Sequence, residues 1–264
     1  MPPKVGTEYL KAEYTSTELM ATVASRLLEN GKSVFVGTGL PIIAAMLAQR
    51  THAPNLLIVF EAGGVGPIVP IMPISVGQSW TFYKAVSATS MHDVMCSAQA
   101  GYTDYGFLGA AMIDMYGNIN TTVIGEHALP KTRLPGSGGA NDVGSYSWRT
   151  ILIMRQEKRR FMKKVDFITT PGYLTGPGAR EKAGLPSGTG PWRVITQLGM
   201  YGFDDATKRL KLLATHPGVT VGQVQENSEF EILMLDHVGT TEPPTADQRR
   251  ILHEIDPLGI AIGK

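Results

Sequence analysis

The chain has 264 residues, of which 43% are hydrophobic and 18% are charged. This length is enough for one substantial α/β domain, and we predict a single domain over residues 1–264. The net charge of +1 favours neither nucleic acid nor an anionic membrane as a partner. The single cysteine, Cys96, excludes an internal disulfide framework and a multi-cysteine metal or redox motif. We expect Cys96 to be buried as a small apolar side chain.

No apolar stretch indicates export or insertion into a membrane. The first 14 residues carry charged side chains and lack the apolar core of a signal peptide. No apolar run approaches the roughly 20 residues that a membrane-spanning helix needs. The sequence therefore predicts a soluble, cytoplasmic protein without a membrane partner.

The first sixty residues predict alternating helices and strands. Thr15-x-x-Glu18 has the arrangement of a helix capping box, and an apolar stripe of helical period follows it. A glycine turn at residues 37–39 lacks the third glycine of the dinucleotide fingerprint and the Gly-Lys-Ser/Thr of a P-loop, so it gives little support to nucleotide binding. The two strands should be parallel, with a right-handed crossover. The expected order is helix, strand, helix, strand, over residues 16–30, 33–36, 42–50 and 56–60.

A carboxylate stands where the second of these strands ends. Residues 56–60 are wholly apolar, which is typical of a strand buried on both faces of a parallel sheet. Glu61 follows directly, and the glycines at 63, 64 and 66 would let backbone and substrate approach closely. Glu61 could simply pair with a nearby cation or meet water, which is the common fate of charged residues. It could instead be a covalent nucleophile, because carboxylates form acyl intermediates.

Between Glu61 and residue 134, loops alternate with short elements. Three prolines predict a long loop over residues 65–80, lying over the strand ends. We expect a helix over residues 85–99 and a short strand over residues 105–110. Asp, Gly and Asn crowd residues 113–122 in the manner of a tight turn or hairpin.

A second glycine cluster follows, formed by Gly136, Gly138 and Gly139 and completed by Ala140. Three glycines in four residues can present consecutive backbone N–H groups to an anion, because no side chain stands between the amides and a ligand. A flexible turn is the alternative interpretation of the same residues.

The second half begins with a basic segment and continues as short strands. Residues 155–164 hold six of the 24 basic residues. Because the whole chain is nearly neutral, we interpret this segment as a solvated or interface-forming face rather than a nucleic-acid site. A Gly/Pro-rich loop is expected over residues 171–192, and Thr245 should cap a terminal helix. We further expect strands at 165–169 and 230–234, a hairpin of strands 194–196 and 210–213 around Asp204-Asp205, and a helix at 223–227.

Several stretches, in the same order along nearly the whole chain, resemble the β subunit of the two-subunit family I CoA-transferases, and most of all the glutaconate CoA-transferase branch. Two of them are Ile58-Val59-Phe60-Glu61-Ala62-Gly63 and Gly136-Ser137-Gly138-Gly139-Ala140-Asn141. The loop that follows Gly63 departs from the glutaconate pattern, which leaves the substrate open. The other matching stretches are 36–41, 109–118, 157–161, 170–172, 176–181, 216–219 and 254–257.

The resemblance implies a fold, a reaction and a set of site residues. The fold is an α/β three-layer sandwich with a mostly parallel sheet. Glu61 is implied to be the catalytic nucleophile, which attacks an acyl-CoA thioester and then carries CoA as a glutamyl-CoA thioester before an acceptor acid takes it. Gly136, Gly138, Gly139 and Ala140 are implied to bind the substrate carboxylate and to line the site. Coenzyme A is a co-substrate, and no separate cofactor or metal is expected.

The resemblance also implies a partner. The family's other glycine-rich segment, which supplies the oxyanion hole, belongs to the α subunit, so we expect a hetero-oligomer that includes this α subunit. Two alternatives stay open. A side branch of the same fold could hydrolyse, decarboxylate or ring-open a CoA ester, because fold does not fix function. The chain could also be a binding or scaffold protein without catalytic residues.

Overall fold

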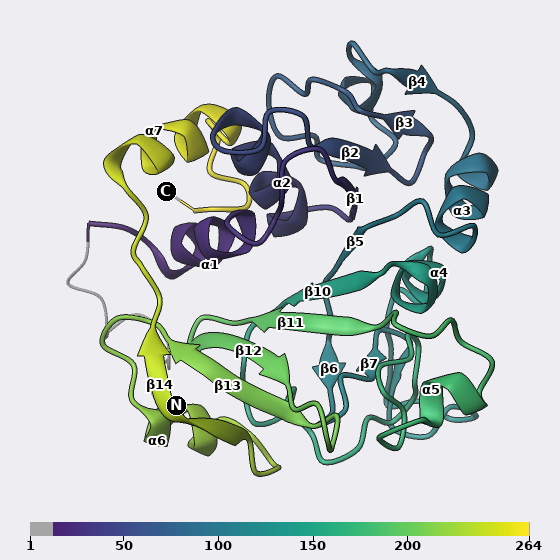
Figure 1. Cartoon of the computed structure of the whole chain (residues 1–264), viewed down its shortest axis with the longest axis vertical. Coiled ribbons are helices and arrows are strands. Elements are labelled where there is room, and N and C mark those ends of the chain that lie inside the picture. The colour runs from purple at the N-terminus through teal and green to yellow at the C-terminus, as the bar shows by residue number, and fades with distance from the viewer. Residues whose placement is uncertain (1–12, 264) are drawn as a thin grey trace.

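The computed structural model describes residues 13–263, and one ten-stranded sheet runs through it (Figure 1). The order of strands is β14-β13-β12-β11-β10-β5-β1-β2-β3-β4. The five central strands, β11, β10, β5, β1 and β2, are mutually parallel. Their bounds, with those of the outer strands, are β1 Ser33–Val36, β2 Leu57–Phe60, β3 Gly64–Val65, β4 Ser87–Ala88, β5 Tyr105–Leu108, β10 Arg149–Ile153, β11 Pro191–Ile195, β12 Gly199–Phe203, β13 Leu210–Thr215 and β14 Leu233–Thr240.

Helices and two small hairpin sheets surround this sheet. The hairpins pair β6 (Met112–Ile113) with β7 (Ile119–Asn120), and β8 (Val123–Ile124) with β9 (Thr132–Arg133). The first of them confirms the turn predicted over residues 113–122. The helices are α1 Ser16–Ser25, α2 Leu40–Arg50, η1 Ser79–Phe82, α3 Met91–Gln99, α4 Ala140–Tyr146, α5 Ala179–Lys182, α6 Val221–Glu226 and α7 Ala246–Ile255.

Two apolar cores, one on each face of the sheet, make the fold a three-layer sandwich. Along β1, Val34 and Val36 pack with α1, α2 and α7, whereas Phe35 points to the other face and shares a core with Val94 of α3 and Val143 of α4. Figure 1 shows the same division, with α1, α2 and α7 grouped together and α3 and α4 beyond the other side of the sheet. This alternation follows from the period of two in a strand. The predicted fold class is confirmed.

Several elements lie where local sequence signals predicted them. Strand β1 has the predicted bounds, and it pairs with β2 in parallel register, Val36 opposite Phe60. The capping box of Thr15 and Glu18 is formed, and Thr245 caps α7. A capping box provides acceptors for the N–H groups that have no partner within the helix, so it marks the first residue of a helix accurately.

Three predicted elements are wrong in position. The helix expected over 85–99 begins only at Met91, because Ser90 and Asp93 form a capping box there and residues 87–88 pair with β3 instead. The hairpin around Asp204-Asp205 joins β12 to β13, so β12 separates the two strands that we expected to pair. The last strand runs over β14, whose first residue is Leu233, while Phe230 and Ile232 enter the core before it.

Two further expectations are wrong. Residues 165–169 are not a strand, because none of them pairs with a strand, and the bridge between Ile119 and Thr170 lies just after them. Cys96 is exposed, since Val94 and Ala98 take the buried face of α3 and Cys96 lies between them on the opposite face.

Most of the amino-terminal stretch assessed for a signal peptide lies outside the described residues. Within residues 13–263, no helix is long and apolar enough to cross a membrane.

Two buried ionisable groups have pKa values shifted toward their neutral forms in the folded chain. Burial lowers the pKa of His216 from 6.5 to about 4, while the ring contacts Thr241 Oγ1 at 2.7 Å and Thr196 O at 2.8 Å. Burial raises the pKa of Asp114 from 3.8 to about 6, against the hydrogen bond that Asn118 donates to it at 2.8 Å. Both shifts have desolvation of the charged form as their main cause.

Replacing His216 by glutamine should remove an acid-dependent loss of stability. Because the folded pKa lies below the unfolded one, the unfolded chain binds an extra proton between pH 6.5 and about 4, and stability falls as the pH falls through that window. Relative to His216→Gln, the wild-type free energy of unfolding should drop by about 3 kcal/mol by pH 4. Urea unfolding at several pH values measures this difference.

Asp114→Asn is the matched control for this experiment. Its raised pKa gives the opposite sign, because ionised Asp114 costs stability as the pH rises from 3.8 through about 6. The two variants should therefore diverge from the wild type in opposite directions. A stability difference between wild type and His216→Gln that is independent of pH would contradict a neutral buried His216.

Candidate active site

Glu61 lies at the carboxyl end of β2, immediately after Phe60. The chain turns back at once, because the Gly63 N–H donates to Phe60 O at 2.9 Å. Gly63 has a φ of +112°, and a Cβ there would lie 2.1 Å from Thr89 O, while a Cβ on Gly64 would lie 1.9 Å from Thr81 O. These glycines therefore allow close approach by the chain's own backbone. The packing of these two residues therefore does not support the close approach of substrate that we expected there.

The structure brings Glu61 against the second glycine cluster, 78 residues along the chain. The Gly139 N–H donates a hydrogen bond to Glu61 Oε1 at 3.1 Å. A Cβ on Gly139 would lie 3.1 Å from that oxygen, and one on Gly138 would lie 3.8 Å from it. Glu61 is half-buried, and across residues 13–263 it forms no ion pair with Lys, Arg or His. The interpretation of Glu61 as one half of an ion pair therefore has no support.

The amides of the glycine cluster do not all point the same way. The Gly136 N–H donates to Thr121 O at 2.8 Å, and the Ala140 N–H donates to Ser137 O at 2.9 Å. These two amides are occupied by the chain's own carbonyls, whereas the consecutive amides of Gly138 and Gly139 are not, and the Gly139 N–H meets the Glu61 carboxylate. In the part of the chain that the structure describes, the Gly138 N–H has no hydrogen-bond acceptor. Gly138 and Gly139 are the residues of the cluster that face Glu61.

Side chains that sequence reasoning missed hold both ends of this cluster. Thr121 Oγ1 donates to Gly136 O at 2.8 Å, and Asn141 Nδ2 donates to Thr169 O at 2.9 Å. The turn itself uses positive φ values at Gly136 (+98°) and Gly138 (+47°), which glycine adopts without steric cost. Thr121 lies within the predicted turn and Asn141 within a stretch that carries the family resemblance, but nothing in their spacing indicates which carbonyls they bind.

Substituting Gly139 by alanine should lower activity with little loss of stability. The φ of −81° suits alanine, but the new Cβ would lie 3.1 Å from Glu61 Oε1 and 2.3 Å from Met95 Cε. The methionine end can move away, whereas the carboxylate must shift to keep its hydrogen bond. We expect kcat to fall about tenfold, since small displacements of reacting groups cost rate steeply. Steady-state assays measure it.

Gly222→Ala is the matched control for this substitution. A Cβ on Gly222 would meet only Thr220 Oγ1, at the ordinary contact distance of 3.8 Å, in helix α6. Its activity should match the wild type. If Gly139→Ala were as active as Gly222→Ala, the contact between Glu61 and the glycine cluster would have no role in the reaction.

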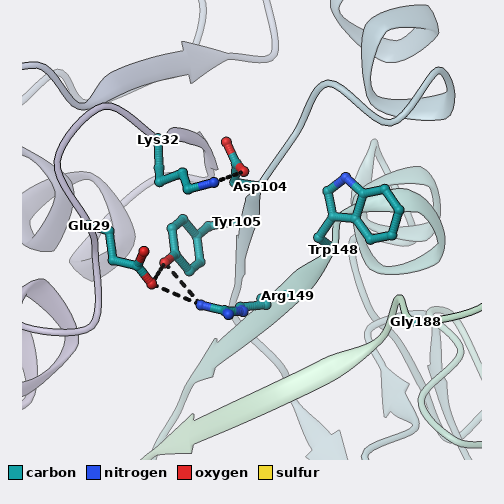
Figure 2. Close-up of a pocket in the computed structure, with 7 residues that line it drawn as sticks. All are labelled: Glu29, Lys32, Asp104, Tyr105, Trp148, Arg149 and Gly188. Carbon is teal, nitrogen blue, oxygen red and sulfur yellow. Dashed lines mark hydrogen bonds and ion pairs between the residues drawn. The ribbon is translucent and has the colours of Figure 1, made fainter.

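A cavity of about 500 Å³ lies at the other end of the parallel strands (Figure 2). Its residues stand at the amino ends of β1, β5 and β10, whereas Glu61 stands at a carboxyl end. Figure 2 shows its charged side chains paired: Lys32 with Asp104 at 3.0 Å, and Arg149 with Glu29 at 2.9 Å. The lining residues are Glu29, Lys32, Asp104, Tyr105, Trp148, Arg149 and Gly188.

Glu61 is a half-buried carboxylate at the carboxyl end of a parallel strand, and it contacts the glycine turn that precedes α4. This is the position in which α/β proteins bind their ligands. The sequence pattern of the coenzyme A transferase family matches residues 17–227. The chain belongs to that family.

Individual relatives agree with this assignment. The chain is 40% identical to the B-type subunit of glutaconate CoA-transferase from Acidaminococcus fermentans over 253 residues, which is 92% of this chain and 93% of the relative. It is 37% identical to the B-type subunit of 3-oxoadipate CoA-transferase from Pseudomonas knackmussii, over 92% and 94% of the two chains. It is also 28% identical to the IpdB chain of the cholesterol ring-cleaving hydrolase from Rhodococcus jostii, over 94% and 95%.

Solved structures with this fold likewise include both a CoA-transferase and an enzyme of another reaction. The crystal structure of the glutaconate CoA-transferase from Acidaminococcus fermentans superposes with a TM-score of 0.91 at 38% identity, over 96% of this chain and 98% of that chain. The decarboxylase AibA/AibB superposes with a TM-score of 0.81 at 25% identity, over 96% and 100%. The transferase resemblance predicted from motifs is confirmed, and the fold also serves other reactions.

Proposed function

We propose that this chain is the catalytic B-type subunit of a CoA-transferase and that Glu61 carries CoA as a glutamyl-CoA thioester. One observation carries the proposal: the Glu61 carboxylate has no cation partner in the described chain and instead receives the Gly139 N–H at 3.1 Å. A carboxylate without a paired cation keeps its charge available for attack. An N–H donor is the group needed where negative charge develops on an oxygen.

The proposed reaction proceeds in two exchanges at Glu61. First, a carboxylate oxygen of Glu61 attacks the thioester carbonyl of the acyl-CoA, the C–S bond breaks, and an acyl-glutamyl anhydride and CoA thiolate result. The thiolate then attacks the glutamyl carbonyl, which releases the donor acid and leaves the glutamyl-CoA thioester. The acceptor carboxylate reverses both steps. Glutamate suits this role because its carboxylate is close in energy to the substrate carboxylates, so neither intermediate is too stable or too costly.

In this proposal the glycine cluster lines the active site. Gly139 would donate to the Glu61 oxygen as its carbonyl becomes tetrahedral, and Gly138 has an N–H free to meet a substrate carboxylate. Gly136 and Ala140 contribute by closing the turn, since their amides bind the chain's own carbonyls. Coenzyme A enters as a co-substrate, and the proposed steps need no metal or further cofactor.

We further propose that an α-type subunit is the partner of this chain. Both transferase relatives are named as B-type subunits, which implies an A-type companion in those enzymes. Gly138 and Gly139 supply only two amides beside Glu61, and a second set of donors would come from the partner. The Pro/Gly loops at 65–80 and 171–191 and the basic segment at 155–164 are the candidate contact surfaces.

A second candidate function is hydrolysis or decarboxylation of a CoA ester. The relatives named as a ring-cleaving hydrolase and as a decarboxylase favour it, because they share this fold over nearly their whole length. In such an enzyme Glu61 would serve as a general base rather than as a nucleophile.

Initial-rate kinetics of the assembled enzyme separate the two functions. With an acyl-CoA donor and a panel of mono- and dicarboxylic acids, we expect parallel double-reciprocal lines, which are typical of a ping-pong reaction through a covalent intermediate. A new acyl-CoA should form only when the acceptor acid is present, and free CoA should not accumulate. Release of CoA or carbon dioxide without an acceptor would contradict the transferase proposal.

A further inference from the structure

Arg180 is a fully buried cation that the proposed reaction does not use. Its side chain is 1% exposed, and it is among the largest completely buried side chains of the described chain. No carboxylate in residues 13–263 forms an ion pair with it. Burial lowers its pKa below the ordinary arginine value. Since a buried charge without a counter-ion is costly, the hydrogen bonds of its guanidinium have to compensate for the lost solvation.

The guanidinium of Arg180 joins three segments of chain, and the third is reached through the hydrogen bond that Nη2 donates to Thr189 Oγ1 at 2.9 Å. Nη1 donates to Pro171 O and Gly172 O, both at 2.9 Å. Nη2 donates to Gly144 O at 3.3 Å and to Ser145 O at 3.0 Å, near the carboxyl end of helix α4. Such carbonyls have no partner inside a helix, and a planar guanidinium can satisfy several at once.

Helix α4 connects this clamp to the candidate active site. It begins at Ala140, one residue after Gly139, and ends at Tyr146, so Arg180 holds its last turn while Gly139 precedes its first. The same neighbouring segment holds its start, since Asn141 Nδ2 donates to Thr169 O at 2.9 Å. A Cβ on Gly144 would lie 2.1 Å from Thr170 Cγ2, so α4 lies tightly against this segment.

We propose that Arg180 is a positioning residue for the reaction at Glu61: by fixing α4 against residues 169–172, it fixes the direction of the Gly139 N–H toward the Glu61 carboxylate. Arg180 does not touch substrate, because it is buried within the chain. In this proposal it acts on the site through α4. The inference rests on the proposed function of Glu61 and adds the group that holds its hydrogen-bond donor in place.

The test compares Arg180→Met and Arg180→Lys with wild type in the complex with the partner chain. We expect Arg180→Met to lower kcat by about 10- to 100-fold, because small displacements of a catalytic donor cost this much. The KM for acyl-CoA should stay within about threefold, since Arg180 makes no substrate contact. Lysine offers donors from a single nitrogen and cannot bind both pairs of carbonyls, so Arg180→Lys should lie between Arg180→Met and wild type.

Arg26→Met is the matched control for a purely structural effect. Arg26 likewise donates to backbone carbonyls, Glu242 O at 2.7 Å and Pro243 O at 2.9 Å, but it joins α1 to the segment before α7. It should lower the melting temperature while kcat stays within about twofold of wild type. The Arg180 variants should lose far more kcat than a control of equal or lower melting temperature.

Several results would overturn the inference: an Arg180→Met kcat within about threefold of wild type, a rise in KM with kcat intact, or an equal loss of kcat in Arg26→Met. If Arg180→Met does not assemble, Arg180→Lys decides by the same criteria. An inactive Glu61→Gln together with a fully active Arg180 variant would reject this inference alone. An active Glu61→Gln would reject the proposed function itself.

Discussion

Replacing Glu61 by glutamine should lower the transfer rate of the assembled enzyme by at least about 10,000-fold, which is the scale of loss when a covalent nucleophile is removed. The amide oxygen of glutamine can still accept the Gly139 N–H, so the local structure should persist. Glu61 is half-buried and follows β2 rather than lying within it, so the substitution should cost little stability. Glu61→Ala should be equally inactive.

Circular dichroism, thermal unfolding and activity are to be measured on the same preparations. Glu226→Gln is the matched control, because Glu226 is an exposed glutamate at the end of α6. It should retain full activity. If Glu61→Gln kept a rate within about tenfold of wild type, Glu61 would not be the nucleophile.

The chain purified alone should show no transfer activity, and co-expression with an α-type partner should restore it. A tetrahedral intermediate at Glu61 needs several preorganised donors, and the loss of one donor typically costs roughly 100- to 1000-fold. The glycine cluster faces Glu61 with only Gly138 and Gly139. An interface between the two chains would also exclude water, which would otherwise hydrolyse an anhydride or a thioester.

The assay uses acyl-CoA with a panel of carboxylic acids, and the oligomeric state is measured on the same samples. A complex carrying Glu61→Gln shows whether the partner alone has activity. Full transfer by the isolated chain would mean that its own residues complete the site, and the proposed role of the interface would then be wrong.

The parts of the fold that the sequence predicted are those with local causes. An apolar run and a following glycine turn place β1 and β2, and hydroxyl-x-x-Glu or hydroxyl-x-x-Gln patterns mark the starts of α1 and α7. Strand β12 was missed because Gly199 and Gly202 make its sequence a poor strand, and its neighbours in the sheet stabilise it instead.

The candidate site was predictable in its members but not in its contacts. Glu61 and the glycine cluster stood out by residue type and by resemblance, and the structure brings them to 3.1 Å. Thr121, Asn141 and Arg180 hold the cluster through backbone carbonyls distant in sequence. Such partners depend on tertiary structure, and no spacing rule along the chain indicates them.

Trapping of the covalent intermediate tests the central claim most directly. The complex is incubated with acyl-CoA and then treated with borohydride, which should reduce the glutamyl-CoA thioester to a primary alcohol and inactivate the enzyme. Tryptic cleavage should release residues 51–84, in which Glu61 is the only carboxylate side chain. We predict that the mass change from carboxyl to alcohol appears on this peptide, requires acyl-CoA, and is absent from Glu61→Gln. Modification of any other residue, or no modification despite turnover, would contradict a glutamyl-CoA intermediate at Glu61.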